Sequence, residues 1–139
     1  MKAVLVDAGP IVALLDRSDR HHEACRKALA DIRAPLATVW PAVTEAAYLL
    51  SSVSPRAQTP LFEMLESGAL ELLPLGAADI PRMRELMEKY RDLPMDLADA
   101  ALVRAAEREG LTSVLTTDQR DFSLYRPTHT RAFHLLPKR

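Results

Sequence analysis

The sequence predicts an α/β fold, a three-layer α/β/α arrangement with a central parallel sheet of four to five strands. Short, almost wholly apolar runs recur along the chain, as in strands that are buried on both faces of a sheet. Segments with helical spacing of apolar residues separate these runs, and such alternation forms a parallel sheet with helices on both faces. With 139 residues, 48% of them hydrophobic, the chain is expected to form one domain over residues 1–139.

The expected elements alternate along the chain. Each expected strand is a short run rich in Val, Leu, Ala or Thr, and these runs lie at residues 3–6, 36–39, 70–73, 113–117 and 132–136. Each expected helix carries apolar residues three or four positions apart. The helices lie at residues 11–15, 21–33, 40–50, 61–66, 79–90 and 94–110.

Several boundaries have a specific chemical signal. Pro10 and Pro41 suit the first turn of a helix, where their missing N–H group costs nothing. Asp79 is expected to cap the helix that follows it, and Gly68 is a normal C-terminal stop. Residues 122–127 show neither helical nor strand spacing and are expected to be irregular.

The overall charge is nearly balanced, with a formal net charge of −1. The chain therefore has no overall positive charge that would indicate nucleic-acid binding, and any surface that binds nucleic acid must be a local basic patch. Basic residues do gather near the end of the chain, at Arg120, Arg126, Arg131, Lys138 and Arg139. Their pattern fits phosphate binding and also an ordinary solvated surface.

The single cysteine, Cys25, excludes an internal disulfide bond and a zinc site built from several cysteines. The start of the chain does not resemble a signal peptide, because Asp7 interrupts the apolar run after Lys2 and no small-residue cleavage site follows. No apolar run approaches the roughly 18–20 residues that span a bilayer. We therefore expect a cytoplasmic protein with no membrane partner.

Acidic residues stand where expected strands end or helices begin. Asp7 follows the first strand, Asp118 follows the fourth, and Glu45 lies near the start of the helix after the second. Asp96 and Asp99 are three positions apart near the start of an alanine-rich helix, so they share one face of it. Ligands of parallel α/β sheets bind beyond the carboxyl ends of the strands. If the first and fourth strands are neighbours in the sheet, all five acids can therefore reach one pocket.

Each acid alone has an ordinary explanation as a helix cap, a turn residue or a partner of the helix dipole. Clustered carboxylates without Lys or Arg partners, however, raise one another's pKa and strain the fold unless a cation lies between them. An all-oxygen set suits Mg²⁺ or Mn²⁺, whereas zinc usually takes His or Cys. Enzymes that transfer phosphoryl groups commonly use such an ion.

At these acids the chain resembles PIN-domain ribonucleases, most closely the VapC toxins of bacterial type II toxin–antitoxin modules. The four segments that carry the resemblance, in the family's order, are residues 4–16, 40–46, 95–100 and 116–122. The resemblance extends over essentially the whole chain, and the fold expected from it is PIN-like. One departure is Ala8, where the family commonly has Thr or Ser.

The resemblance assigns roles to individual residues. The family's catalytic, metal-binding acids fall on Asp7, Glu45, Asp99 and Asp118. Asp96 is expected to be an auxiliary metal ligand or a residue that positions water. Thr116 or Thr117 is expected to hydrogen-bond a ligating carboxylate, and Asp121 is expected to cap the turn after the fourth strand.

The implied function is a Mg²⁺- or Mn²⁺-dependent endoribonuclease that hydrolyses phosphodiesters of tRNA, rRNA or mRNA. The implied partners are a second copy of the chain and a small cognate antitoxin that silences the toxin. Apolar helix residues are candidates for partner surfaces and equally for ordinary core, namely Leu49, Leu50, Leu61, Phe62 and Leu65. The alternative is a catalytically weak PIN scaffold that binds RNA or a protein partner.

Overall fold

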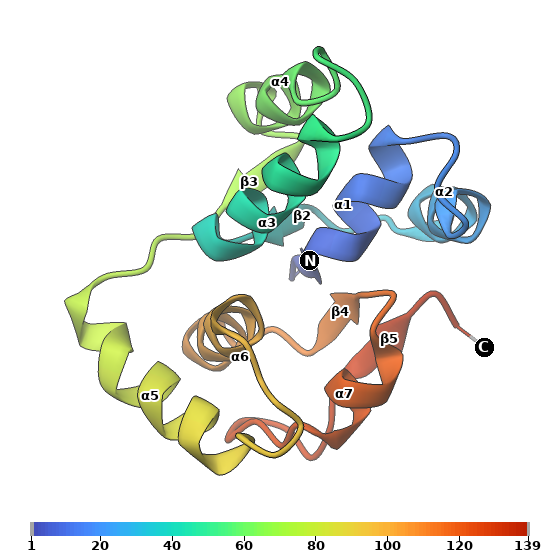
Figure 1. Cartoon of the computed structure of the whole chain (residues 1–139). Helices are drawn as coiled ribbons and strands as arrows, with labels where there is room; N and C mark the ends of the chain where they lie inside the picture. The colour runs from blue at the N-terminus through green and yellow to red at the C-terminus, as the bar shows by residue number, and fades with distance from the viewer. Residues whose placement is uncertain (1, 139) are drawn as a thin grey trace.

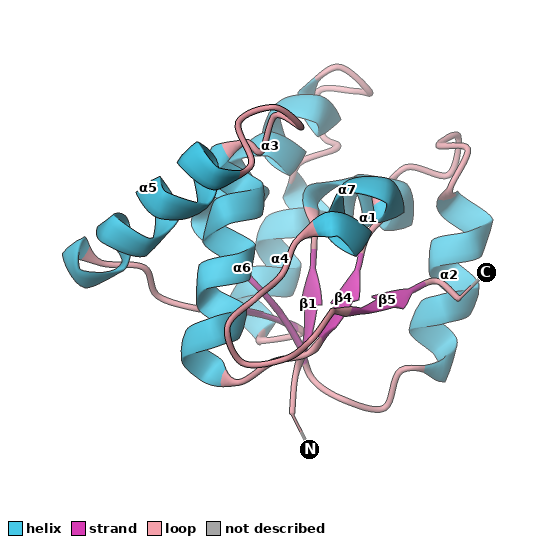
Figure 2. Ribbon diagram, turned by 90° about the horizontal axis from the view of Figure 1, so that it is seen from below, coloured by secondary structure: helices cyan, strands magenta, loops and turns pink. Residues whose placement is uncertain are grey.

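Five short parallel strands form the centre of this computed structural model, which describes residues 2–138, and their order is β3–β2–β1–β4–β5. The strands are Val4–Val6 (β1), Leu36–Thr38 (β2), Leu70–Leu72 (β3), Ser113–Leu115 (β4) and His134–Leu136 (β5). Figure 2 shows β1, β4 and β5 side by side. The predicted α/β fold with a parallel sheet is confirmed, and β1 lies in the middle of that sheet.

Helices cover both faces of the sheet (Figure 1). One face carries the helices Ala8–Leu15 (α1), Trp40–Ser51 (α3) and Thr59–Ser67 (α4), and the other carries Ile80–Lys89 (α5), Leu97–Glu109 (α6) and Gln119–Leu124 (α7). The remaining helix, His22–Asp31 (α2), packs against α1. None of these helices, within residues 2–138, has the length and apolar character needed to cross a membrane.

The side chains of β1 explain why both faces are covered. Val4 and Val6 point to one face and join the buried core of α1, α3 and α4, while Leu5 points to the other face and joins the core around α6. All three side chains are at most 7% exposed. A strand buried on both faces reads as a continuous apolar run, which is the pattern that predicted it.

Eight of the thirteen residues of helix α6 are buried. Four of its alanines, Ala100, Ala101, Ala105 and Ala106, pack with Leu102 and Val103 at 0% exposure, because small side chains let the helix approach the sheet closely. The Asp96 carboxylate caps it by accepting the N–H of Asp99 at 2.8 Å. At its other end Gly110 adopts a φ of 70°, the left-handed conformation that glycine tolerates best.

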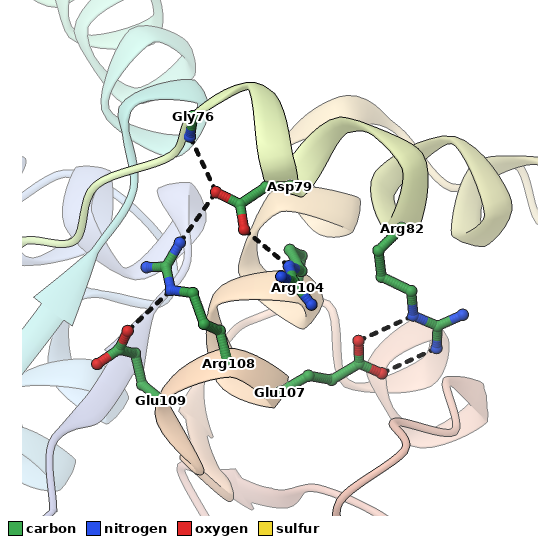
Figure 3. A network of polar contacts seen from close by, with 7 residues as sticks. All are labelled: Gly76, Asp79, Arg82, Arg104, Glu107, Arg108 and Glu109. Carbon is green, nitrogen blue, oxygen red and sulfur yellow. Dashed lines mark hydrogen bonds and ion pairs between the residues drawn. The ribbon is translucent and has the colours of Figure 1, made fainter.

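Asp79 precedes α5 as predicted, but its carboxylate does not bond the first amides of that helix. It accepts the N–H of Gly76 instead, across the 3₁₀ turn Ala77–Asp79 (η1), and it pairs with Arg104 at 2.8 Å and Arg108 at 3.0 Å (Figure 3). The backbone N–H of Gly76 and the two guanidinium groups lower the pKa of Asp79 below its ordinary value. This network ties α5 to α6.

The segment after β4 differs from the sequence expectation. Residues 119–124 form α7, whereas the sequence predicted an irregular segment over 122–127. Asp118 is the cap of this helix, and its carboxylate accepts the N–H of Asp121. The expectation that Asp121 provides the cap is therefore wrong. Phe122 and Tyr125 are fully buried and hold the short helix against the core.

Candidate active site

Asp7 lies at the carboxyl end of the central strand and is held by two donors. Its Oδ1 accepts the N–H of Ala8 at 2.8 Å, which caps α1, and its Oδ2 accepts the hydroxyl of Thr116 at 3.0 Å. The Thr116 oxygen in turn accepts the N–H of Asp118 at 3.0 Å. Thr116 therefore connects two of the predicted acids, and the expected contact between a threonine after β4 and a site carboxylate is confirmed for Thr116.

Asp99, in the first turn of α6, is the second of the five predicted acids that is buried, at 8% exposure. Its Oδ2 accepts a hydrogen bond from the hydroxyl of Tyr125 at 2.7 Å, and its own N–H is donated to Asp96. The other three predicted acids are exposed: Asp96 at the start of α6, Glu45 on α3 and Asp118 before α7. The site thus combines two buried carboxylates in fixed positions with three exposed carboxylates whose side chains can rotate.

The five acids are close enough for the charge of one to shift the pKa of another. Burial, with smaller contributions from the charges of Glu45 and Asp96, raises the pKa of Asp7 to about 6. Burial also raises the pKa of Asp99 to about 8, with additional repulsion from Asp7, Asp96 and Asp118. Burial is again the main cause of the raised pKa of Glu45 and of Asp118, and Asp96 adds to both.

The acids fit a divalent cation by donor type and by charge. Among residues 2–138, none of the five carboxylates forms an ion pair with Lys, Arg or His. Oxygen ligands of this kind are the ones that Mg²⁺ and Mn²⁺ favour. As the side chains lie, no three Asp, Glu, His or Cys residues of the described chain are arranged to hold an ion. Binding one therefore requires the exposed acids to turn toward the buried pair.

Tyr125 is the residue that sequence reasoning missed at this site. It lies in the segment that was expected to be irregular, and the contact it makes is 26 positions away along the chain. No motif or spacing marks it. The only signal in the sequence is chemical: a tyrosine within an otherwise apolar cluster needs a partner for its hydroxyl when it is buried.

Solved structures with the same fold come from toxin–antitoxin systems. VapC20 of Mycobacterium tuberculosis, described as a toxin that cleaves the sarcin–ricin loop, superposes with a TM-score of 0.82 at 18% identity and covers 93% of this chain and 99% of its own. The VapBC2 complex of Rickettsia felis, bound to promoter DNA, gives 0.67 at 16% identity over 96% and 98%. A toxin–antitoxin complex of Klebsiella pneumoniae gives 0.65 at 17% over 95% and 100%. These similarities support the fold.

The sequence itself matches a protein family and a named ribonuclease. The PIN domain family matches residues 4–126. The ribonuclease VapC26 of Mycobacterium tuberculosis is 32% identical over 136 residues, which cover 96% of this chain and 100% of the relative. The match spans the elements that carry the five acids, so the resemblance predicted from the sequence is confirmed. The chain belongs to the PIN-domain family and, within it, to the VapC ribonucleases.

Proposed function

We propose that this chain is a Mg²⁺- or Mn²⁺-dependent endoribonuclease that acts as the toxin of a toxin–antitoxin pair. The catalytic acids are Asp7, Glu45, Asp99 and Asp118, and Asp96 is an auxiliary ligand. The observation that carries the proposal is a group of carboxylates at the carboxyl edge of the sheet that raise one another's pKa. Between residues 2 and 138 they form no ion pair with Lys, Arg or His. Such a group is costly to maintain unless it binds a cation.

The buried acids and the exposed acids have different proposed roles at the site. Asp7 and Asp99 are buried and hydrogen-bonded, so they give fixed ligand positions. Glu45, Asp96 and Asp118 are exposed and can turn toward the ion or toward a water molecule near the scissile phosphate. When bound, Mg²⁺ or Mn²⁺ activates water and offsets the negative charge that develops on the phosphodiester oxygens.

The RNA surface is proposed to surround these acids. Trp40 begins α3 at the carboxyl end of β2, the same edge of the sheet as Asp7, and the residue is 54% exposed. An exposed aromatic ring provides a platform on which an unpaired base stacks. Arg120, exposed on α7 next to Asp118, is placed to contact a phosphate, which makes binding sensitive to salt.

The proposed protein partners are a small antitoxin and a second copy of the chain. Of the apolar residues singled out in the sequence, Leu50 and Leu61 are fully buried core, whereas Leu49 is 41% and Phe62 46% exposed. Tyr48, 76% exposed, extends the exposed apolar surface along α3. These side chains are available for a protein interface in a way that the core leucines are not.

The function is tested by incubating the purified chain with total tRNA and rRNA in the presence of Mg²⁺. We expect discrete fragments with 5′-phosphate and 3′-hydroxyl ends, and no fragments in EDTA or with Asp7→Asn. Undiminished cleavage in EDTA would contradict the metal-dependent mechanism. Binding of RNA without any cleavage by the wild-type chain would favour the scaffold alternative.

Thr116→Val is expected to lower the rate of cleavage by about 10- to 100-fold, the usual effect of losing an outer-shell partner of a metal ligand. The substitution keeps the shape of the side chain but removes both its bond to Asp7 and its bond to the N–H of Asp118. Thr38→Val is a matched control, because Thr38 is equally buried and donates to the carbonyl of Val6 instead of a carboxylate. Rate measurements on both folded variants should show the loss only for Thr116→Val.

A further inference from the structure

Tyr125 is completely buried, and its hydroxyl donates to a carboxylate of the proposed site. The bond to Oδ2 of Asp99 is 2.7 Å long. The ring itself is fixed by edge-to-face packing against Tyr90 at 5.0 Å and Phe122 at 5.1 Å between ring centroids. A buried phenol hydroxyl needs a hydrogen-bond partner, and here that partner is an acid.

The position of Tyr125 follows from the short helix α7. Asp118 caps the start of this helix and Tyr125 occupies its C-cap, so one element supplies an acid at one end and a hydroxyl to a second acid at the other. The segment that leads into α6 is fixed by the same aromatic cluster, because the Tyr90 carbonyl accepts the N–H groups of Leu93 and Met95. These contacts therefore fix how α6 and α7 lie relative to each other next to the acids.

We infer that Tyr125 is a positioning residue that fixes the orientation of the Asp99 carboxylate for binding a divalent cation. The inference rests on the proposed metal-dependent function. Without the hydroxyl, the Asp99 carboxylate loses a donor in a buried place and becomes able to rotate about its Cβ–Cγ bond. Outer-shell donors of this kind orient metal ligands, and their loss weakens metal binding by about 10- to 100-fold.

Tyr125→Phe and Tyr90→Phe form a matched pair of variants. Each removes one hydroxyl from the same aromatic cluster and keeps the ring, so both are expected to fold. The Tyr90 hydroxyl accepts the backbone N–H of Arg126 at 2.8 Å and contacts no acid in the described hydrogen bonds. The two variants therefore separate the contact with Asp99 from a general loosening of the cluster.

The experiment is a titration of each full-length protein with Mn²⁺, followed by electron paramagnetic resonance of the unbound ion. We expect Tyr125→Phe to raise the Kd for Mn²⁺ by about 10- to 100-fold, and Tyr90→Phe to leave it unchanged. In steady-state cleavage of RNA, Tyr125→Phe is expected to lower kcat while KM stays near that of the wild type. Thermal melts of both variants report any purely structural effect separately.

Two results would overturn the inference. Wild-type affinity for Mn²⁺ in Tyr125→Phe would show that the hydroxyl does not act on the metal site, and equal weakening in Tyr90→Phe would show that the cluster acts only through packing. If the wild-type chain itself binds no Mn²⁺, the proposed metal-dependent function fails as well. Comparison with the wild type therefore distinguishes failure of the inference from failure of the function.

Discussion

Asp99→Asn is expected to abolish RNA cleavage and, at neutral pH in the absence of divalent ions, to stabilise the folded protein. The lost activity should exceed the roughly 10- to 100-fold cost of losing an outer-shell partner, because a proposed ligand itself is removed. The gain in stability follows from burial, which raises the pKa of Asp99 to about 8 and makes its charged form unfavourable. Asparagine has the same shape, carries no charge and still accepts the hydrogen bond from Tyr125.

Opposite effects on activity and stability are typical of a residue kept for function at the expense of the fold. Asp79→Asn is the matched control, because Asp79 is also a buried acid but pairs with Arg104 and Arg108. That substitution should destabilise the protein and leave the cleavage rate of the folded fraction unchanged. Chemical denaturation and single-turnover cleavage check both variants. Wild-type cleavage by folded Asp99→Asn would contradict the assignment of Asp99.

The stability of the metal-free protein is expected to fall as the pH rises from about 4 to about 8. Asp7 and Asp99 have folded-state pKa values of about 6 and about 8, against 3.8 as the ordinary value. Between these limits the folded protein binds more protons than the unfolded chain, so raising the pH favours unfolding. The total loss is on the order of a few kcal/mol, since each unit of pKa shift corresponds to about 1.4 kcal/mol before screening.

Urea denaturation in EDTA at several pH values measures this slope. Below pH 4 the slope should reverse, because the pKa of Asp79 is lowered by the Gly76 N–H and its arginine partners and its contribution is lost on protonation. Saturating Mg²⁺ should flatten the fall between pH 4 and 8 by binding the ionised acids. A free energy of unfolding that increases steadily from pH 4 to 8 in EDTA would contradict the raised pKa values.

The parts of the fold that the sequence predicts are those that depend on local patterns. The continuous apolar run of β1 and the helical spacing of α6 reflect burial directly, and the acids at their ends follow from chain order. Helix α7 was not predicted, because its six residues are too few to show a helical period. Its stability comes from the Asp118 cap and from burial of Phe122, and both depend on the surrounding structure.

The unpredicted features of the candidate site are long-range contacts between side chains. The bond of Tyr125 to Asp99 joins residues 26 positions apart, and no spacing rule links such a pair. The same holds outside the site for the bond of Arg104 to Asp79, which spans 25 positions. Chain order does predict which acids share the edge of the sheet. It does not predict that Asp7 and Asp99 are buried while Asp96 is exposed, because burial depends on how α6 and α7 pack.

The most direct test of the central claim, that these carboxylates form a divalent-cation site, is a thermal melt at pH 8 with and without Mg²⁺. We predict that Mg²⁺ raises the Tm of the wild-type chain, with a stabilisation of about 2.7 kcal/mol at one hundred times the Kd. The Asp99→Asn variant should show no such rise. An unchanged wild-type Tm at every Mg²⁺ concentration, or an equal rise in the variant, would contradict the claim.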